Sequence, residues 1–138
     1  MQTFLPYPGF AESARVLDDI RLGKQRVEAF QIVRTLAGVT KGWRHHPAVK
    51  MWRGHEDALV DYGLAMCVEW TNRGRADTVH DKLLEHRSDR DAVLPPWFGD
   101  PDFHASHRSN LLRKDPQWYG QFGWAEPDDL PYVWPISG

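Results

Sequence analysis

Apolar side chains recur every three or four residues through much of this chain, the spacing that places them on one face of an α-helix. Ala29, Val33 and Leu36 form one such stripe, which predicts a first long helix from about Asp18 to Leu36. Gly38 follows at the position where a C-terminal cap is expected. Alternating β-branched runs, which would predict strands, are nearly absent.

A second and wider apolar stripe runs through the segment that ends near Gly74. Its members are Leu59, Tyr62, Met66 and Trp70, with Val60, Leu64 and Cys67 beside them. A face of this width predicts a helix that is buried at the centre of the fold. Pro47 suits the first turn of this second helical region, because a first turn leaves its amide hydrogens unpaired and proline has none.

Two capping signals predict further helices. Asp77 can cap a short helix that runs to about His86. Asp100 is followed by a proline, so it marks the start of a longer helix that runs to about Lys114.

After Asp115 the chain is rich in turns and aromatic rings. The rings belong to Trp118, Tyr119, Phe122, Trp124, Tyr132 and Trp134. So many large rings would otherwise be exposed, and they therefore predict an ordered wrap around the helices. The pattern as a whole predicts an all-α fold: one compact domain over residues 1–138, with three to four main helices, long connections and an aromatic C-terminal wrap.

The length of 138 residues suits one domain that buries a core without disulfides. Cys67 is the single cysteine, which excludes an intramolecular disulfide and suits a reducing compartment. No run approaches the roughly 18 apolar residues of a membrane span, and the opening MQTFLPYPGF lacks the features of a secretory signal. We therefore expect a cytoplasmic monomer that does not associate with membranes.

The net charge of −2 argues against a general binder of polyanions, but the charge is unevenly distributed. Residues 1–56 hold nine Lys or Arg against five Asp or Glu, whereas residues 115–138 hold four acidic residues and no basic one. This segregation favours an anion-binding face in the N-terminal part. Ordinary scatter of solvated charge is the alternative.

The first predicted helix carries a charged face. Arg21, Lys24 and Glu28 follow one another at spacings of three and four, and Gln25 lies beside them. On a solvated surface the pair formed by Lys24 and Glu28 would be worth only a few tenths of a kcal/mol. In a functional site, Glu28 would be an acid or base whose neighbouring cations hold phosphates.

The run Trp43-Arg44-His45-His46-Pro47 allows three interpretations. Contact of Arg44 and His46 with phosphates or bases is favoured over metal binding, because no further histidine lies at a recognised zinc spacing. The third interpretation is a structural corner in which Trp43 is buried.

Two further features leave alternatives open. His104 and His107 share a helix face, which most often is a surface patch. Trp118 and Tyr119 either stack on unpaired bases or pack in the core. Phosphate-binding loops of the G-x-x-x-x-G-K-[ST] and G-x-G-x-x-G types are absent, as is a serine nucleophile elbow.

Several of these residues together match the motif pattern of one family. Phe4, Pro8 and Phe10 form a short opening segment of aromatic residues and proline, Glu28 lies on the first long helix, and TKGWRHHP follows at 40–47. In this the chain resembles the pyrimidine-dimer DNA glycosylases of the phage endonuclease V type and their bacterial relatives. The resemblance is clearest over roughly residues 1–60, and the aromatic pair near the C-terminus is a weaker match.

The resemblance implies a compact, mostly helical domain that needs no metal or organic cofactor. The N-terminal α-amine would attack the sugar C1′, expel the base and form an imine that permits β-elimination, with Glu28 as acid and base. The partner would be double-stranded DNA with a damaged or abasic site. The DNA-binding set would comprise Arg21, Lys24, Gln25, Arg26, Arg44, His45, His46, Lys50, Trp118 and Tyr119.

The chain departs from the phage pattern at its start. Met1 precedes the bulky Gln2, which disfavours removal of the methionine, so Met1 itself is expected to supply the amine. Lys24, one turn from Glu28, is an alternative nucleophile, and Val27 stands where the phage type has arginine. We therefore expect a DNA glycosylase with coupled abasic-site lyase activity.

Two other functions remain open at this point. One is a noncatalytic nucleic-acid-binding module on the same scaffold. The other is a metal-dependent hydrolase that uses His45 or His46 together with His104 and His107.

Overall fold

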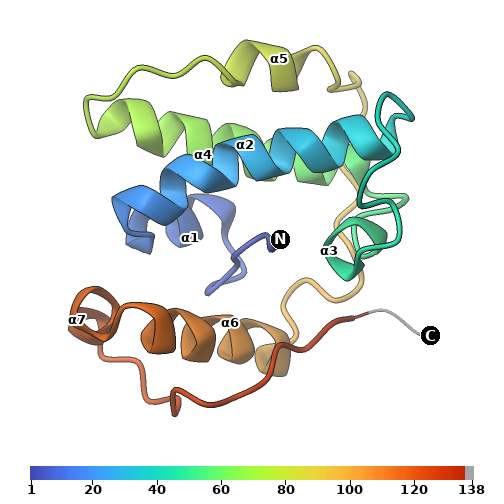
Figure 1. The fold of residues 1–138 in the computed structure, drawn as a ribbon. Coiled ribbons are helices and arrows are strands. Elements are labelled where there is room, and N and C mark those ends of the chain that lie inside the picture. The colour runs from blue at the N-terminus through green and yellow to red at the C-terminus, as the bar shows by residue number, and fades with distance from the viewer. Residues whose placement is uncertain (136–138) are drawn as a thin grey trace.

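Helices α2 (Asp19–Leu36) and α4 (Glu56–Asn72) lie side by side at the centre of the computed structural model, which describes residues 1–135 (Figure 1). Both helices were predicted from their apolar stripes, and both are confirmed. Gly63 of α4 permits close packing on two sides, because a Cβ there would lie 3.1 Å from Ala29 Cβ of α2 and 2.7 Å from Cδ1 of Leu83, which lies outside this pair.

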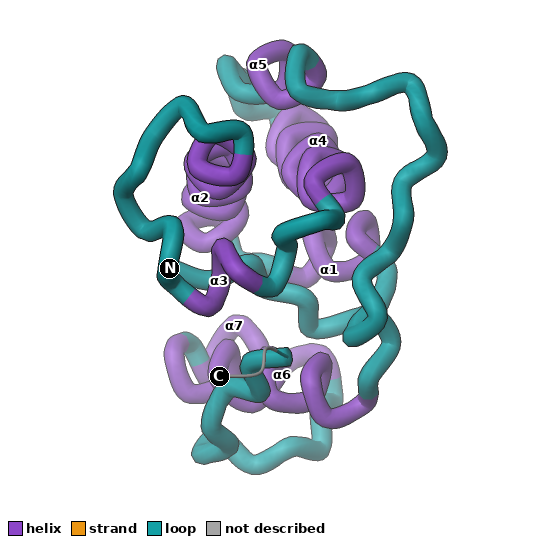
Figure 2. The backbone as a smooth tube through the Cα atoms, turned by 90° about the vertical axis from the view of Figure 1, so that its right-hand side faces the viewer, coloured by secondary structure: helices purple, strands orange, loops and turns teal. Residues whose placement is uncertain are grey.

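Helix α6 (Pro101–Lys114) forms a second layer beneath this pair (Figures 1 and 2). Its start is as predicted, since the Asp100 side chain accepts a hydrogen bond of 3.1 Å from the Asp102 amide. Helix α3 (Pro47–Lys50) also begins at the predicted proline, but it ends at Lys50, so the predicted second helical region is divided into α3 and α4.

The predicted fold class is confirmed: residues 1–135 form an all-α domain with three long helices and no strand. Two elements differ from expectation. Helix α1 (Phe10–Val16) was not predicted, because seven residues are too few to display a periodic stripe. Helix α5 (His80–Leu84) is shorter than expected; Asp77 does accept a hydrogen bond of 2.8 Å from the His80 amide, but the helix begins only there. No helix in this range is long and apolar enough to cross a bilayer.

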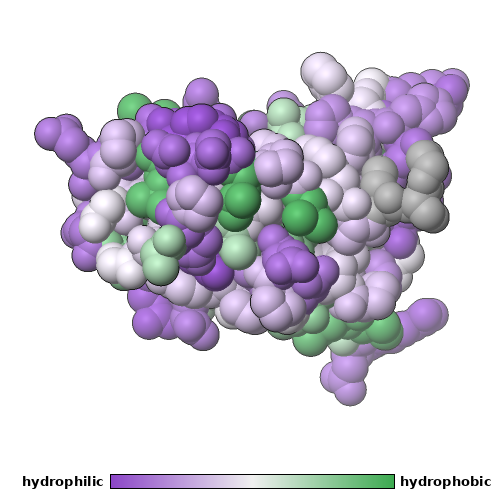
Figure 3. All heavy atoms as spheres, turned by 90° about the horizontal axis from the view of Figure 1, so that it is seen from below, coloured by the Kyte–Doolittle hydropathy of each residue, from purple (hydrophilic) through white to green (hydrophobic). Residues whose placement is uncertain are grey.

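The C-terminal aromatic wrap is present and contains α7 (Pro116–Tyr119) and the 3₁₀-helix η1 (Gly120–Phe122). Tyr119 is fully buried and stacks on Trp124, with ring centroids 5.7 Å apart. Figure 3 views the molecule from the side of α6 and shows separate apolar spots in a largely polar surface. Four further rings of the wrap are partly buried against the core, so most of the wrap packs the core: Phe122, Trp124, Tyr132 and Trp134.

The N-terminal segment runs between the two layers and is held by both (Figures 1 and 2). The Phe4 amide donates to Gln25 Oε1 of α2 at 2.8 Å. On the α6 side, the Leu5 amide donates to His107 Nδ1 at 2.9 Å, and His104 Nδ1 donates to the Leu5 carbonyl at 2.8 Å. The two histidines were expected on the surface, and this expectation is wrong: both are buried because they bind the backbone of this segment.

Acid should destabilise this arrangement through His107. Burial lowers the pKa of His107 from about 6.5 to about 3, and the nearby His104 adds to this effect. Between these values the unfolded chain binds the proton and the folded chain does not, so stability falls as the pH decreases through this window, by up to about 1.4 kcal/mol per pH unit.

We predict that the free energy of unfolding, measured in urea, declines from pH 7 to pH 4. The variant His107→Gln keeps an acceptor for the Leu5 amide, and its free energy of unfolding should decline less steeply with pH. The difference between the two slopes should correspond to the uptake of nearly one proton on unfolding. Equal slopes for the parent and the variant would contradict a neutral buried His107.

Candidate active site

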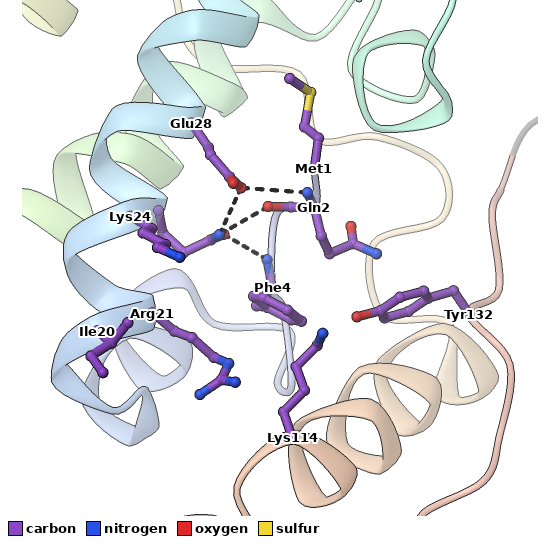
Figure 4. A pocket seen from close by; sticks show the side chains of 10 residues that line it. Met1, Gln2, Phe4, Ile20, Arg21, Lys24, Glu28, Lys114 and Tyr132 are labelled. Atoms are coloured by element: carbon purple, nitrogen blue, oxygen red, sulfur yellow. Dashed lines mark hydrogen bonds between the residues drawn. The ribbon is translucent and has the colours of Figure 1, made fainter.

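A cavity of about 310 Å³ opens between α2 and the C-terminal end of α6 (Figure 4). Five of its lining residues lie on one face of α2, where spacings of three and four residues connect them. Residues from both ends of the chain complete it. The full lining is Met1, Gln2, Phe4, Ile20, Arg21, Lys24, Gln25, Glu28, Lys114 and Tyr132. The structure therefore places Arg21, Lys24, Gln25 and Glu28 together with Met1, as the sequence-based site requires.

Glu28 is half-buried at the inner end of this cavity. Its Oε2 accepts hydrogen bonds from Gln25 Nε2 at 3.1 Å and from the Gln2 amide at 3.4 Å. Within the described residues its Oε1 accepts none, so one carboxylate oxygen is free to exchange a proton. The carboxylate is thus fixed in position through one oxygen only.

Gln25 is the residue that joins Glu28 to the N-terminal segment. It is buried; its Nε2 donates to the Gln2 carbonyl at 2.9 Å as well as to Glu28. Its Oε1 accepts from the Phe4 amide, and the Tyr62 hydroxyl lies 2.5 Å from the same oxygen. Gln25 was assigned to DNA contact from the sequence, but the structure uses its donor and acceptor inside the protein.

His46 lies close enough to Met1 and Glu28 to respond to their charges. Burial is the main cause that lowers its pKa; the N-terminal ammonium lowers it further, and Glu28 opposes both. Its Nδ1 accepts a hydrogen bond of 3.0 Å from the Ala48 amide, so the neutral ring carries its proton on Nε2. A neutral imidazole near the amine adds no further positive charge to those of Arg21, Lys24 and Lys114 in the cavity.

The remaining cations proposed from the sequence lie outside this cavity. Arg26 is on another flank of α2, where it forms an ion pair with Asp77 and its guanidinium lies 4.5 Å from the Trp70 ring centroid. Arg44 and His45 are exposed, with Arg44 Nε donating to His45 Nε2 at 3.2 Å. Lys50 is half-buried in α3.

Two of the aromatic residues assigned from the sequence differ from their expected roles. Trp43 is 65% exposed at a left-handed φ of 66°, so it is not a buried corner. Tyr119 has no exposed surface to offer DNA, and its hydroxyl bonds to Asp18. Trp118 donates its indole N–H to the Val16 carbonyl at 2.8 Å and does not line the cavity, but it is 38% exposed, so its contact with DNA stays a prediction.

Gln2, Lys114 and Tyr132 were missed by sequence reasoning. Lys114 and Tyr132 reach the cavity only because α6 and the C-terminal segment fold under α2, and no local pattern signals that contact. Gln2 carried a usable signal, because it directly follows the expected nucleophile.

The described residues hold no cluster of histidine, cysteine or carboxylate side chains that fits a metal ion. His104 and His107 hold the backbone of the N-terminal segment, and His46 uses its Nδ1 to cap α3. These placements do not support the metal-dependent hydrolase.

Comparison of the chain with curated proteins and with solved structures gave no match. A comparison with family models did give one. Residues 1–83, which include α1 to α4 and the α2 face of the cavity, match the model described as pyrimidine dimer DNA glycosylase.

Proposed function

Because the chain belongs to the pyrimidine dimer DNA glycosylase family, we propose that it removes damaged pyrimidines from double-stranded DNA and then cleaves the strand at the resulting abasic site. The observation that carries this proposal is the cavity that holds Met1, Glu28 and the cations Arg21 and Lys24 on one side of the molecule. Every group that the chemistry needs comes from the chain itself, so no cofactor enters the proposal.

The nucleophile in this proposal is the α-amine of Met1. An α-amine has an ordinary pKa of about 7.7–8.0, so a substantial neutral fraction exists near neutral pH, whereas a lysine titrates near 10.4. The amine attacks C1′ of the damaged nucleotide, and the C1′–N1 bond breaks with its electron pair on the departing base. The carboxylate of Glu28 takes the proton that the amine loses.

Strand cleavage follows from the same covalent intermediate. The C1′–O4′ bond opens, O4′ receives the proton from Glu28, and the nitrogen lone pair completes a C1′=N imine. This imine is protonated, since its nitrogen keeps one hydrogen. The Glu28 carboxylate, which is free again, then takes a proton from C2′, and the C3′–O3′ bond breaks with its electrons on the 3′ phosphate oxygen. Water hydrolyses the imine and restores the amine.

Phosphates would be held by the cations around the cavity and on the adjoining surface. Arg21 and Lys24 line the cavity on α2, and Lys114 faces them from α6 (Figure 4). On the side of α3, the proposal keeps Arg44, His45, His46 and Lys50 as contacts with the strand. Arg26 contributes less in this proposal because Asp77 neutralises it.

The test is borohydride trapping on two duplexes, one with a thymine dimer and one with an abasic site. We expect a covalent adduct with both, because both reach the same imine. An adduct with the abasic duplex alone would support the abasic-site lyase activity and contradict the removal of the damaged pyrimidine. Binding to both duplexes without any adduct would favour the noncatalytic module instead.

A further inference from the structure

The side chain of Gln2 carries a buried hydrogen-bond donor that the protein does not use. Gln2 is 6% exposed and lines the cavity, and its Oε1 accepts a hydrogen bond of 2.9 Å from the Thr3 amide. Its Nε2 is buried and has no partner in the part of the chain that the structure describes. In Figure 4 the carboxamide points across the cavity toward Tyr132.

The orientation of this carboxamide follows from its contact with Thr3. If the oxygen and nitrogen were exchanged, an N–H₂ group would face the Thr3 N–H and two donors would meet. The nitrogen is therefore the other atom of the carboxamide, which lies on the side of Tyr132 (Figure 4). A buried donor without a partner is costly to a fold, so its retention in a cavity indicates a ligand acceptor.

Two other buried donors without partners do not share this position. His107 Nε2 lies in the core, and Arg26 Nε lies beside Trp70, outside the cavity. Gln2 alone combines an unpaired donor with the cavity that holds the amine and Glu28. Tyr132 adds a second donor there, because burial raises the pKa of its hydroxyl and keeps it protonated.

We propose that Gln2 Nε2 donates a hydrogen bond to the O2 carbonyl oxygen of the pyrimidine that is being released. This inference rests on the proposed function, because it takes the Met1 amine as the group that attacks C1′. O2 is bonded to C2, which is adjacent to N1, so it is the base oxygen nearest to C1′. A donor on the residue next to the nucleophile is placed to meet it.

The contact would stabilise the leaving group. When the C1′–N1 bond breaks, its electron pair stays on N1 and is shared with O2 through C2. The charge on O2 therefore grows from the bound substrate to the transition state, and a fixed donor there lowers the barrier. The N1–C2–O2 unit persists in a cyclobutane dimer, whose saturated carbons are C5 and C6. Gln2 thus acts on base release and has no role in the later elimination.

Because Gln2 is proposed to act on base release and not on elimination, the two steps can be tested separately. The variants Gln2→Glu and Gln2→Met both keep a large residue after Met1, which preserves the expected N-terminus. Glu retains an oxygen for the Thr3 amide and loses the donor, whereas Met loses both groups. Gln117→Glu is the matched control for charge, because Gln117 is exposed on α7. Cleavage of the C1′–N1 bond in a dimer duplex, read out after photoreversal frees the cut base from its neighbour, and cleavage of an abasic duplex are then measured for each protein.

We expect both Gln2 variants to release the base about 10²-fold more slowly, as when one donor to a developing anion is removed. Cleavage at the abasic site, where no base remains, should change by less than about twofold on the same principle. An equal loss on the two substrates would show a merely structural role and would overturn the inference, as would unchanged base release. If the parent itself forms no imine at the abasic site, the proposed function fails as well, and the two failures are distinguishable.

Discussion

Replacing Glu28 by Gln should lower strand cleavage about 10²–10⁴-fold, the usual contribution of a general acid or base, while DNA affinity stays within a few fold. The amide has the shape of the carboxylate and keeps an oxygen for the Gln25 and Gln2 donors, so the local structure should persist. It cannot take the proton that the amine loses, and it cannot return one to O4′. The effect should therefore appear in the rate of cleavage and in the yield of the borohydride adduct.

The measurement is single-turnover cleavage of a dimer duplex with Glu28→Gln beside the parent, together with a binding titration. Glu85→Gln is a matched control, since Glu85 is exposed at the end of α5 and makes no side-chain hydrogen bond within residues 1–135. Cleavage by Glu28→Gln at the parent's rate would remove Glu28 from the mechanism. A parallel loss of binding would indicate that Glu28 acts on the structure of the site.

Adding one serine before Met1 should reduce the yield of the trapped adduct by more than about 10²-fold. The addition turns the Met1 nitrogen into an amide and moves the new amine about 3.8 Å along the chain, out of a site where 1 Å matters. The fold should be unaffected because the segment is held from Gln2 onward. Equal helical content and an equal melting temperature for the parent and the extended chain would verify that the fold is intact.

Peptide mapping of the parent adduct identifies the nucleophile independently. A trypsin digest should carry the DNA remnant on the peptide Met1–Arg15. An adduct on Lys24 would instead appear as a missed cleavage at that residue, and it would replace Met1 by Lys24 as the nucleophile. Full trapping by the extended chain would lead to the same conclusion.

The long helices could be predicted because their evidence is local. The stripes of α2 and α4 and the Asp100 cap of α6 lie within a few turns of sequence. The structure agrees at both ends of α2 and α6 and at the C-terminal end of α4, which begins nine residues after the predicted proline. Helix α1 escaped prediction because its seven residues contribute few apolar contacts of their own. Its position depends on packing against α4, which the sequence does not display.

The candidate site, too, could be predicted from the sequence only in part. Arg21, Lys24 and Glu28 share a face by helix geometry alone, so their meeting in one cavity could be anticipated. Spacing does not reveal what a side chain binds, and Gln25 was therefore assigned to DNA although it holds the N-terminal segment. Lys114, from the far end of the chain, could be found only from the tertiary structure.

The hold of α6 on the N-terminal segment has a consequence for biosynthesis. Leu5 is fixed by His104 and His107, which follow it by 99 and 102 residues. During translation the start of the chain leaves the ribosome first, yet the two histidines that fix Leu5 are made about 100 residues later. A polypeptide that stops before α6 thus lacks the groups that hold Leu5, and in it only the contacts with Gln25 and Glu28 of α2 position the start of the chain.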